Sequence, residues 1–420
     1  MNPYRIAFVV PSFPNISETF IYHQIIELMH RGHDIRIFAY KENKNTIIHK
    51  MILDNKLQEI CTFLPRSFMQ KSKSAALKHI KKILRISAII EESAVEELEW
   101  KRTVQFFNSV NIEKWFSDNT TFDIIHVQFG VVGIPIVRMI NTNSVHNAKL
   151  VVTFHGNDLN PFRIAILKEW YSDLFEYADA LTVNSPYLRE ILLSICDQKQ
   201  KIHLLPVGLN IQNFKPDSSQ KKRTESGVFQ IIFCGRLIFL KGADLAIKII
   251  YDLVSRLNIQ NVKLNIIGTG PMKEALEKLI INLNLQEFVV LKGAESQEEL
   301  KVEMSDAHLF ILPGIHDPST NRAETQGLVI QEAQAMGLPV LVSDAGGMKY
   351  GLIDGVTGYI IKAGDIESFS EKIIFFMQNE SLRQIMGIAG REFVTNNYDI
   401  RSITDRLEVI YSEIINQNLN

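Results

Sequence analysis

Short apolar runs recur along the whole chain, and most are followed by a turn and then by a segment with helical periodicity. Such runs are typical of strands buried on both faces, and consecutive parallel strands need a crossover between them, usually a helix. The pattern therefore predicts an α/β fold built from doubly wound parallel sheets. The runs are RIAFVV, DIRIFAY, FDIIHVQF, KLVVTF, ALTV and KIHLLP in the first half, and FQIIFCG, VKLNIIG, FVVLKG, AHLFILP, LPVLVS and TGYII in the second.

A polar stretch separates the two series of strands. Residues 208–227, with PDSSQKKRTESG at their centre, are rich in loop formers, and a chain of 420 residues exceeds the usual size of one domain. We therefore predict a Rossmann-like domain over residues 1–207 and a second one over residues 208–395. Helical segments without intervening strands follow the last strand, and we expect the final one, residues 396–420, to return to the first domain.

Composition excludes several classes of protein. A net charge of −2 gives no general affinity for nucleic acid. The three cysteines are widely spaced and form no CxxC pattern, so they indicate neither a disulfide framework nor a zinc site and fit a reducing compartment. The first apolar run is too short for a signal peptide, and no run reaches the length of a membrane span. We expect a cytoplasmic protein.

One segment departs from the alternation of strands and helices. Residues 66–90 contain seven Lys or Arg residues and no acid, and several of these cations share one helical face. One interpretation is a helix that rests on the anionic inner face of the cell membrane. The other is a solvated helix, because the five glutamates of the following EESAVEELE are able to pair with the lysines.

Two carboxylates of the second half, Glu324 and Glu332, lie on either side of Gly327. Gly327 occupies the position where a helix is predicted to begin, so amides at this point are able to face an oxygen-rich ligand. Apolar runs flank the segment, and a strand, an acidic loop, a helix and a second strand form the usual ligand crevice of an open α/β sheet. The alternative is that the helix dipole alone favours these acids.

Two cations occur in the turn after the first strand of the second half, GRLIFLKG. They are Arg236 and Lys241, and the turn enters a helix at Gly242. Arg offers a planar fork of donors that matches phosphate oxygens, and Lys offers a mobile point charge. Together with the bare amides of the helix end, these cations are suited to bind a diphosphate. The alternative is a pair of ordinary surface charges.

Several further residues are candidates with an open role. His155 follows the run KLVVTF at a strand end, where its imidazole is either structural or a partner for a sugar hydroxyl. We expect Asp158 to cap the helix that follows and His126 to be a core or edge residue. Glu18 begins a helix and is expected to complement its dipole, with acceptor binding as the alternative. Gly268 belongs to a GxGP turn, which lacks the full GxGxxG fingerprint and is able simply to tighten the turn.

Motifs for other chemistries are absent from the sequence. It contains no GxxxxGK[ST] phosphate loop, no GxSxG nucleophile turn and no HxxxH or HExxH spacing. We therefore predict neither a metal ion nor a cofactor.

Taken in order, HGND, GRLIFLKG, the GxGP turn and AETQGLVIQEAQAMGLPVLVS resemble the retaining glycosyltransferases of family 4 over nearly the whole chain. The resemblance implies the GT-B fold, in which two Rossmann-like domains face each other across a cleft. The N-terminal PSFPNISETF looks like the subgroup that builds bacterial exopolysaccharides, such as the colanic acid transferases.

The resemblance also implies roles for the charged residues. Arg236 and Lys241 match the pair that holds the donor diphosphate. Glu324 matches the acid that contacts the transferred sugar, and Glu332 matches the acid that binds the ribose hydroxyls of the nucleotide.

Further contacts implied by the resemblance come from backbone and imidazole groups. Amides around Gly327 and Leu328 would touch sugar or phosphate, and His155 would contact the sugar near the reacting carbon. Gly268 and Gly293 match turns of the nucleotide site.

The chain departs from the family pattern at three places. Its first loop, residues 12–17, lacks the Gly-Gly pair of many relatives. Gly346 and Gly347 are followed by Met-Lys-Tyr, where relatives often read GGxPE, and Gln326 stands where an aromatic residue is common. We expect these departures to affect donor choice more than fold.

These features predict a retaining glycosyltransferase that moves a hexosyl unit from a nucleoside diphosphate sugar to a hydroxyl of a glycan acceptor, which we expect to be lipid-linked. Two other classes stay open. A sugar-nucleotide epimerase of the same architecture would convert the donor without an acceptor, and a non-catalytic protein would bind the donor without turnover. The base, the sugar and the acceptor are not readable, because their contacts come from loops such as 293–296 and 315–323.

Overall fold

The computed structural model describes residues 3–15, 18–44, 48–64, 116, 121–141, 148–216 and 227–416. The basic segment 66–90 lies outside these residues. The chain forms two compact units. The first unit comprises Met1–Asn184, Leu188–Leu205 and Thr404–Asn420, and the second comprises Ser185–Tyr187 and Pro206–Ile403.

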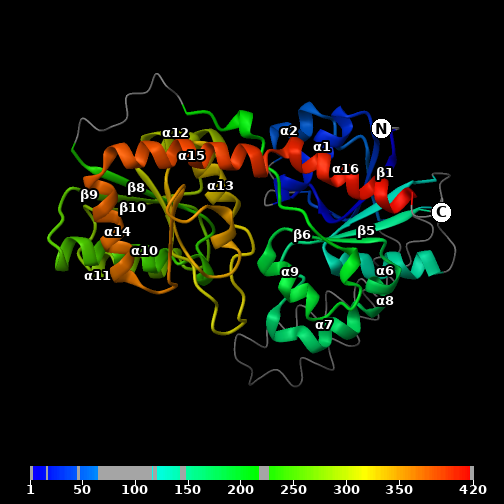
Figure 1. Ribbon diagram of the computed structural model, residues 1–420, viewed down its shortest axis with the longest axis horizontal. Helices are drawn as coiled ribbons and strands as arrows, with labels where there is room; N and C mark the ends of the chain where they lie inside the picture. Colours follow the sequence, from blue (N-terminus) through cyan, green and yellow to red (C-terminus); the bar gives the residue numbers. More distant parts are fainter. Residues whose placement is uncertain are drawn as a thin grey trace. The chain divides into compact units, whose positions relative to one another are not determined.

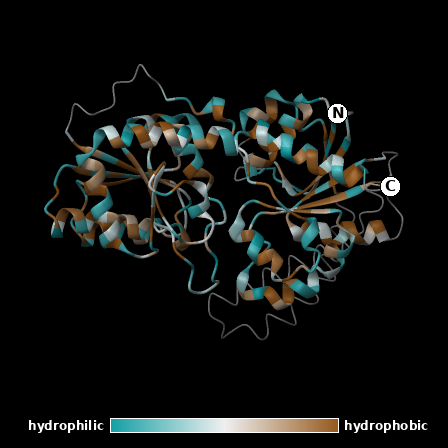
Figure 2. Cartoon of the chain, in the orientation of Figure 1, coloured by the Kyte–Doolittle hydropathy of each residue, from teal (hydrophilic) through white to brown (hydrophobic). Residues whose placement is uncertain are grey.

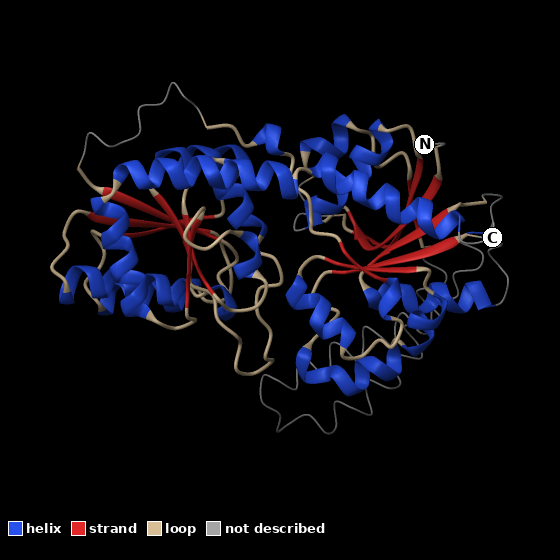
Figure 3. Cartoon of the chain, in the orientation of Figure 1, coloured by secondary structure: helices blue, strands red, loops and turns tan. Residues whose placement is uncertain are grey.

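A seven-stranded parallel sheet forms the centre of the first unit, with the strand order β3-β2-β1-β4-β5-β6-β7 (Figures 1 and 3). The six predicted runs all form strands. An additional strand, β3, lies at the edge, and its three residues are too few to show a periodic pattern. The strands are β1 (Arg5–Phe13), β2 (Asp34–Glu42), β3 (Cys61–Phe63), β4 (Ile124–Gln128), β5 (Lys149–Phe154), β6 (Ala180–Val183) and β7 (Ile202–Leu204).

The order of strands defines where a ligand is able to approach this sheet. β1 pairs with β2 on one side and with β4 on the other. The chain moves outward from β1 to β3 and then returns to β4, so the carboxyl ends of β1 and β4 form a topological switch point, the usual ligand position in such sheets.

The described helices that connect these strands are α1 (Thr19–His30), α2 (Lys50–Asp54), α6 (Gly130–Asn141), α7 (Ile164–Trp170), α8 (Ser172–Tyr177) and α9 (Pro186–Leu193).

The second unit repeats this design with a six-stranded parallel sheet of order β10-β9-β8-β11-β12-β13. All six predicted runs of the second half form strands, and the switch point lies between β8 and β11. The strands are β8 (Phe229–Cys234), β9 (Val262–Ile267), β10 (Val289–Gly293), β11 (Leu309–Leu312), β12 (Val340–Ser343) and β13 (Gly358–Ile361). The helices are α10 (Ala243–Tyr251), α11 (Lys273–Asn282), α12 (Gln297–Asp306), α13 (Leu328–Ala335), α14 (Ile366–Gln378) and α15 (Glu380–Tyr398).

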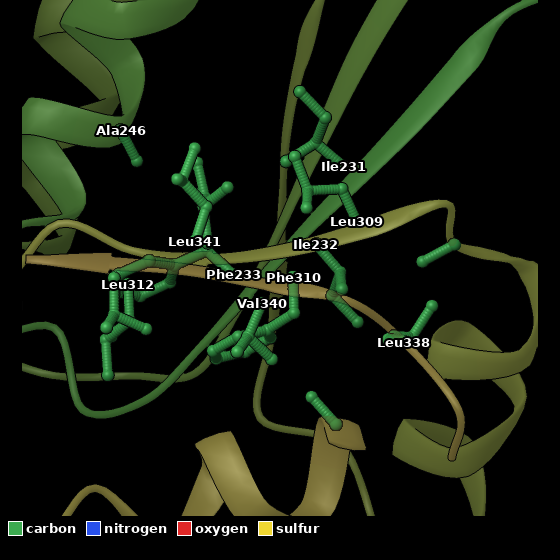
Figure 4. Packing of buried hydrophobic residues seen from close by; sticks show 14 of the residues in the cluster. Ile231, Ile232, Phe233, Ala246, Leu309, Phe310, Leu312, Leu338, Val340 and Leu341 are labelled. Atoms are coloured by element: carbon green, nitrogen blue, oxygen red, sulfur yellow. The ribbon is translucent and has the colours of Figure 1, made fainter. Parts of the chain in front are cut away.

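The core of each unit lies along its strands, which Figure 2 shows as hydrophobic ribbons between mixed helices. Figure 4 shows Ile231, Leu309 and Leu341 from three neighbouring strands on one face of the second sheet, where all three are fully buried. Burial of one such side chain contributes about 1.5–3 kcal/mol to the free energy of unfolding, so continuous apolar strands stabilise each sheet. This explains why unbroken apolar runs, rather than alternating ones, are the main signal in the sequence.

The last helix, α16 (Ile400–Asn416), follows α14 and α15 without an intervening strand, and its residues from Thr404 onward belong to the first unit. Figure 1 shows α16 beside α1 on one face of the first sheet. Tyr411 of α16 is hydrogen-bonded through its hydroxyl to Nδ1 of His126 at 2.6 Å, and Nε2 of that histidine lies 2.7 Å from Oγ1 of Thr153. His126 is fully buried, as expected for a core residue.

Ionic contacts add to the attachment of α16. Glu408 accepts hydrogen bonds from Arg31 at 2.5 Å and pairs with Nε2 of His33 at 2.9 Å, and Arg31 also reaches Asp405 at 2.6 Å. Glu408 and His33 are buried away from water, so each needs the other as a hydrogen-bond partner. The C-terminal helix is therefore an integral part of the first unit.

We expect Tyr411→Phe to destabilise the first unit. The change keeps the ring but removes the hydroxyl that satisfies Nδ1 of buried His126, a loss of about 1–3 kcal/mol. Urea unfolding measures the effect, with Tyr177→Phe as the control, because Tyr177 is 40% exposed. Equal midpoints for the two variants would contradict the proposed contribution of this hydrogen bond.

Candidate functional site

The turn between β8 and α10 carries the two predicted cations of the second unit. Gly242 has a φ of +74° and directly precedes α10, as predicted from the sequence. A Cβ atom at this position would collide with the carbonyl oxygen of Pro313 at the end of β11, so a glycine is required for two reasons. The close approach of these two backbones holds Lys241 beside the loop that follows β11.

Lys241 and Glu324 form an ion pair in the second unit. The other carboxylate oxygen of Glu324 accepts hydrogen bonds from the amides of Thr325 at 3.2 Å and Gly327 at 3.1 Å. Burial alone would raise the pKa of Glu324, but Lys241 and the Gly327 amide hold that pKa below its ordinary value. Glu324 is therefore ionised at neutral pH, and both of its oxygens have protein partners.

Arg236, the other predicted cation, has a different environment. Its side chain is exposed, and no carboxylate among the described residues forms an ion pair with it. The structure therefore brings Lys241 together with Glu324 and leaves Arg236 at the surface of the same turn.

Glu332 lies on α13, which begins directly after Gly327 as predicted. Burial raises the pKa of Glu332 to about 7, although the charge of Lys241 opposes the shift. The thiol of Cys234, at the end of β8, interacts electrostatically with both Glu332 and Lys241. The two acids thus share the neighbourhood of Lys241, but only Glu324 is directly paired with it among the described residues.

Gly346 and Gly347 fix the backbone of the Glu324 loop. The amide of Gly347 donates to the carbonyl oxygen of Glu324 at 2.7 Å. A Cβ atom at Gly346 would collide with this same carbonyl, and one at Gly347 would collide with the carbonyl of Thr325. The Gly-Gly pair after β12 therefore positions the acidic loop through the backbone.

Gly268 and Gly293 lie at the ends of the two strands beyond β8. The amide of Gly268 donates to the carbonyl oxygen of Gly293 at 2.7 Å, and a Cβ atom at Gly268 would collide with the carbonyl of Gly235. The GxGP turn therefore tightens the packing of neighbouring turns at the carboxyl edge, which is the simpler of its two predicted roles. Gly293 has a φ of +81°, and a Cβ atom at this position would meet no other group within 4 Å.

Gln326, at the position where an aromatic residue is common in relatives, connects the acidic loop to the backbone of Val207. Its side chain is buried, accepts from the amide of Val207 at 2.8 Å and donates to the carbonyl of Val207 at 3.0 Å. An aromatic ring would make neither bond. Gln326 thereby attaches the segment after Pro206 to the acidic loop within the second unit.

His155 lies in the first unit, in the loop after β5. Its Nε2 is 2.8 Å from Oε1 of Gln128 at the end of β4, and its ring contacts the rings of Phe20 and Phe129 at 4.9 and 4.7 Å between centroids. Burial lowers the pKa of His155 to about 3, so the imidazole is neutral at physiological pH. A neutral imidazole is able to hydrogen-bond a hydroxyl but not to supply a positive charge. Gln128 was not a sequence candidate, and the signal for it is a polar residue that ends a buried strand.

Asp158 does not cap the helix that follows it, contrary to our expectation; Asn160 does so by accepting from the amide of Phe162. The carboxylate of Asp158 accepts instead from the amides of His155 at 3.1 Å, Gly156 at 2.8 Å and Gly130 at 2.9 Å. Gly130 begins α6, so one buried carboxylate joins the loops after β4 and β5. The prediction failed because this partner is 28 residues away in the sequence.

Neither a membrane-spanning helix nor a cluster of metal-ligating side chains occurs in the part of the chain that the structure describes. No helix there has the length and apolar character to span a membrane. No cluster of three or more His, Cys, Asp or Glu side chains occurs there with a geometry suited to a metal ion.

Two family models match adjoining parts of the chain. Residues 17–213 match Glycosyltransferase Family 4, and residues 214–393 match Glycosyl transferases group 1. Among solved structures, sucrose-phosphate synthase from Thermosynechococcus elongatus superposes with a TM-score of 0.71 at 18% identity, covering 98% of this chain and 99% of that one. HepE from Anabaena in complex with UDP-glucose superposes with a TM-score of 0.68 at 14% identity, covering 98% and 100%.

Curated relatives extend over much or nearly all of the chain. The glycosyltransferase assigned to colanic acid biosynthesis, WcaL of Salmonella typhimurium, is 22% identical over 98% of this chain and 100% of its own length. The amylovoran biosynthesis glycosyltransferase AmsK of Erwinia amylovora is 24% identical over 94% and 96%. The GDP-mannose-dependent alpha-(1-6)-phosphatidylinositol monomannoside mannosyltransferase of Mycolicibacterium smegmatis is 26% identical over 63% and 70%.

Fold, motifs and comparisons define an enzyme of the glycosyltransferase class with the GT-B fold. The chain combines a Glycosyltransferase Family 4 domain in its first half with a Glycosyl transferases group 1 domain in its second half.

We expect Glu332→Gln to change how stability depends on pH. The folded-state pKa of about 7 exceeds the ordinary 4.5, so the folded state binds more protons and the wild type loses stability as pH rises between these values. Gln does not titrate. The stability difference between variant and wild type should therefore grow by about 2 kcal/mol from pH 5 to pH 8, measured by urea unfolding at each pH, and a difference independent of pH would contradict the shift.

Asp158→Asn should disturb His155 specifically. The amide offers one acceptor oxygen where the carboxylate serves three backbone donors, which costs about 1–3 kcal/mol. The measurement is the NMR signal of the His155 imidazole, together with the melting temperature. Asp179→Asn is the matched control, because Asp179 accepts the Leu150 amide at the other end of β5. An unchanged His155 signal in Asp158→Asn would disprove the link.

Proposed function

We propose that this enzyme transfers a hexosyl unit from a nucleoside diphosphate sugar to a hydroxyl of a glycan acceptor, with retention of the anomeric configuration, during exopolysaccharide assembly. The observation that carries the proposal is the arrangement of Lys241, Glu324 and the start of α13 in the second unit. An ammonium group and a helix N-terminus are held beside an ionised acid on a rigid loop.

The relatives support the chemical class. WcaL and AmsK take their names from the biosynthesis of colanic acid and amylovoran, HepE was solved with UDP-glucose, and the mycobacterial relative is GDP-mannose-dependent. A nucleoside diphosphate sugar is therefore the proposed donor, and a glycan, lipid-linked in our proposal, is the acceptor. The base stays undecided between these relatives.

The donor diphosphate is proposed to bind between cations and amides of the second unit. Lys241 has three ammonium donors, and its bond to Glu324 leaves others for phosphate oxygens. Arg236 is exposed and able to reach a ligand, and the amides of Leu328 and Val329 at the start of α13 precede the first amide that bonds back to the helix cap, that of Ile330 to Gly327. Such preorganised donors stabilise the charge that develops on a leaving diphosphate.

Glu324 is proposed to position the cation rather than to attack the sugar. One of its oxygens receives two amides and the other receives Lys241, so a covalent glycosyl intermediate on this acid would require those bonds to break. In the proposed reaction the bond from the anomeric carbon to the diphosphate breaks and the bond to the acceptor oxygen forms. The acceptor proton passes to a phosphate oxygen of the departing diphosphate.

Glu332 and His155 are proposed to hydrogen-bond hydroxyl groups of the donor. Glu332, with a pKa near 7, is suited to pair with the ribose hydroxyls, because it is able both to accept and, when protonated, to donate. Neutral His155 is suited to hydrogen-bond a hydroxyl of the transferred sugar. The proposal includes no cofactor and no metal ion, since side chains supply the positive charge and backbone amides supply hydrogen-bond donors for the diphosphate.

The donor class is tested with purified protein and a panel of UDP-, GDP- and ADP-sugars. We expect thermal stabilisation and slow hydrolysis with one base. Lys241→Ala should reduce turnover by an amount equivalent to about 2–4 kcal/mol. Lys248→Ala is the control, because Lys248 makes a surface ion pair with Asp244 on the neighbouring helix α10.

Three results would contradict the proposal. Full turnover by Lys241→Ala would contradict the assignment of Lys241 to the donor diphosphate. Release of an epimerised sugar nucleotide without transfer would favour an epimerase. Donor binding without hydrolysis or transfer to any acceptor would favour a non-catalytic protein.

A further inference from the structure

Glu18 stands at the start of α1, at the switch point of the first sheet. It precedes Thr19, the first residue of α1, and α1 follows β1. The carboxyl end of β1 lies beside that of β4, from which Gln128 reaches His155. Glu18 is thus an acid at the position where ligands bind in sheets of this topology.

The carboxylate of Glu18 lacks a partner among the residues that the structure describes. It makes no capping hydrogen bond to α1, and no described cation pairs with it. The side chain is half-buried, and burial raises its pKa to about 7. Simple complementation of the helix dipole does not explain this environment, because that role suits a solvated or capping acid, whose pKa would not rise.

Helix α1 is joined to the His155 loop by side chains on its inner face. The Phe20 ring lies 4.9 Å from the His155 ring. Gln24 accepts from Nε2 of Gln128 at 3.4 Å, and Gln128 in turn contacts His155 at 2.8 Å. Glu18 and His155 therefore belong to one connected edge of the first unit.

We propose that Glu18 binds the acceptor, through two neighbouring hydroxyls of an uncharged sugar ring. The inference rests on the proposed glycosyltransferase function and names the acceptor class for the first unit. In its ionised form Glu18 accepts two O–H donors at once, and such charge-assisted bonds are stronger than neutral ones. A phosphate or a uronic acid at this position would instead meet a like charge.

Binding of simple glycosides tests Glu18 without any donor. The probes are octyl β-D-glucopyranoside, octyl β-D-galactopyranoside and octyl α-D-mannopyranoside as neutral sugars, and octyl β-D-glucuronide as the anionic one, followed by saturation-transfer NMR. We expect the wild type to bind a neutral probe and to discriminate against the anionic one. Glu18→Ala should weaken neutral binding by about 10- to 100-fold, and Glu18→Gln by less.

A matched control separates acceptor binding from a helix-dipole effect. Asp173 is an exposed first-turn acid of α8 in the same unit, so Asp173→Asn should leave glycoside binding unchanged. Near-UV circular dichroism verifies that each Glu18 variant is folded, and Glu18→Gln decides the question if the alanine variant is not.

A transfer assay distinguishes this inference from the proposed function. Glu18→Ala should show a raised KM for the octyl glycoside, whereas the control Asp173→Asn should match the wild type both in this KM and in donor hydrolysis. If no sugar nucleotide raises the melting temperature of the wild type or acts as its donor, the proposed function fails. The glycoside-binding measurement still decides the role of Glu18 in that case. Equal binding by wild type and Glu18→Ala, preference for the glucuronide, or no glycoside binding by the wild type would overturn the inference.

Discussion

The ion pair between Lys241 and Glu324 is the interaction on which the candidate donor site depends. It joins the turn after β8 to the loop after β11, at the switch point of the second sheet. A half-buried charge is costly unless it is paired, so each partner constrains the other. The surrounding glycines serve this contact, because Gly242 and the Gly346–Gly347 pair allow backbone approaches that any Cβ atom would prevent.

The two acids of this region show how environment separates residues of one type. Glu324 is held in its ionised form by a lysine and by backbone amides, whereas burial raises the pKa of Glu332 to about 7. One is thus a fixed negative charge that orients a cation, and the other is able to exchange a proton near neutral pH. In the first unit burial keeps His155 neutral, so its contribution to a site is hydrogen bonding and not charge.

Local features of the sequence predicted the architecture well, and side-chain partnerships much less well. The strands, the helix starts at Gly242 and Gly327 and the grouping of the candidate residues near strand ends follow from apolar runs and from glycine chemistry. Asp158 was misinterpreted, and the bonds of Gln326 were not predicted, because their partners, Gly130 and Val207, are distant in the sequence. The edge strand β3 was missed because three residues carry no periodic signal.

By itself the sequence determined the two parallel sheets, the positions of their turns and the resemblance to family 4 glycosyltransferases, because these depend on local patterns of apolar residues, glycines and motif spacing. Tertiary structure alone decided which charges are paired, which acids titrate near pH 7 and which polar residue is structural. Those properties depend on burial and on distances between residues far apart in the chain. Glu18 illustrates the difference, since its place in the sequence suits an ordinary helix start, and only its half-buried carboxylate at the switch point, unpaired among the described residues, indicates a ligand.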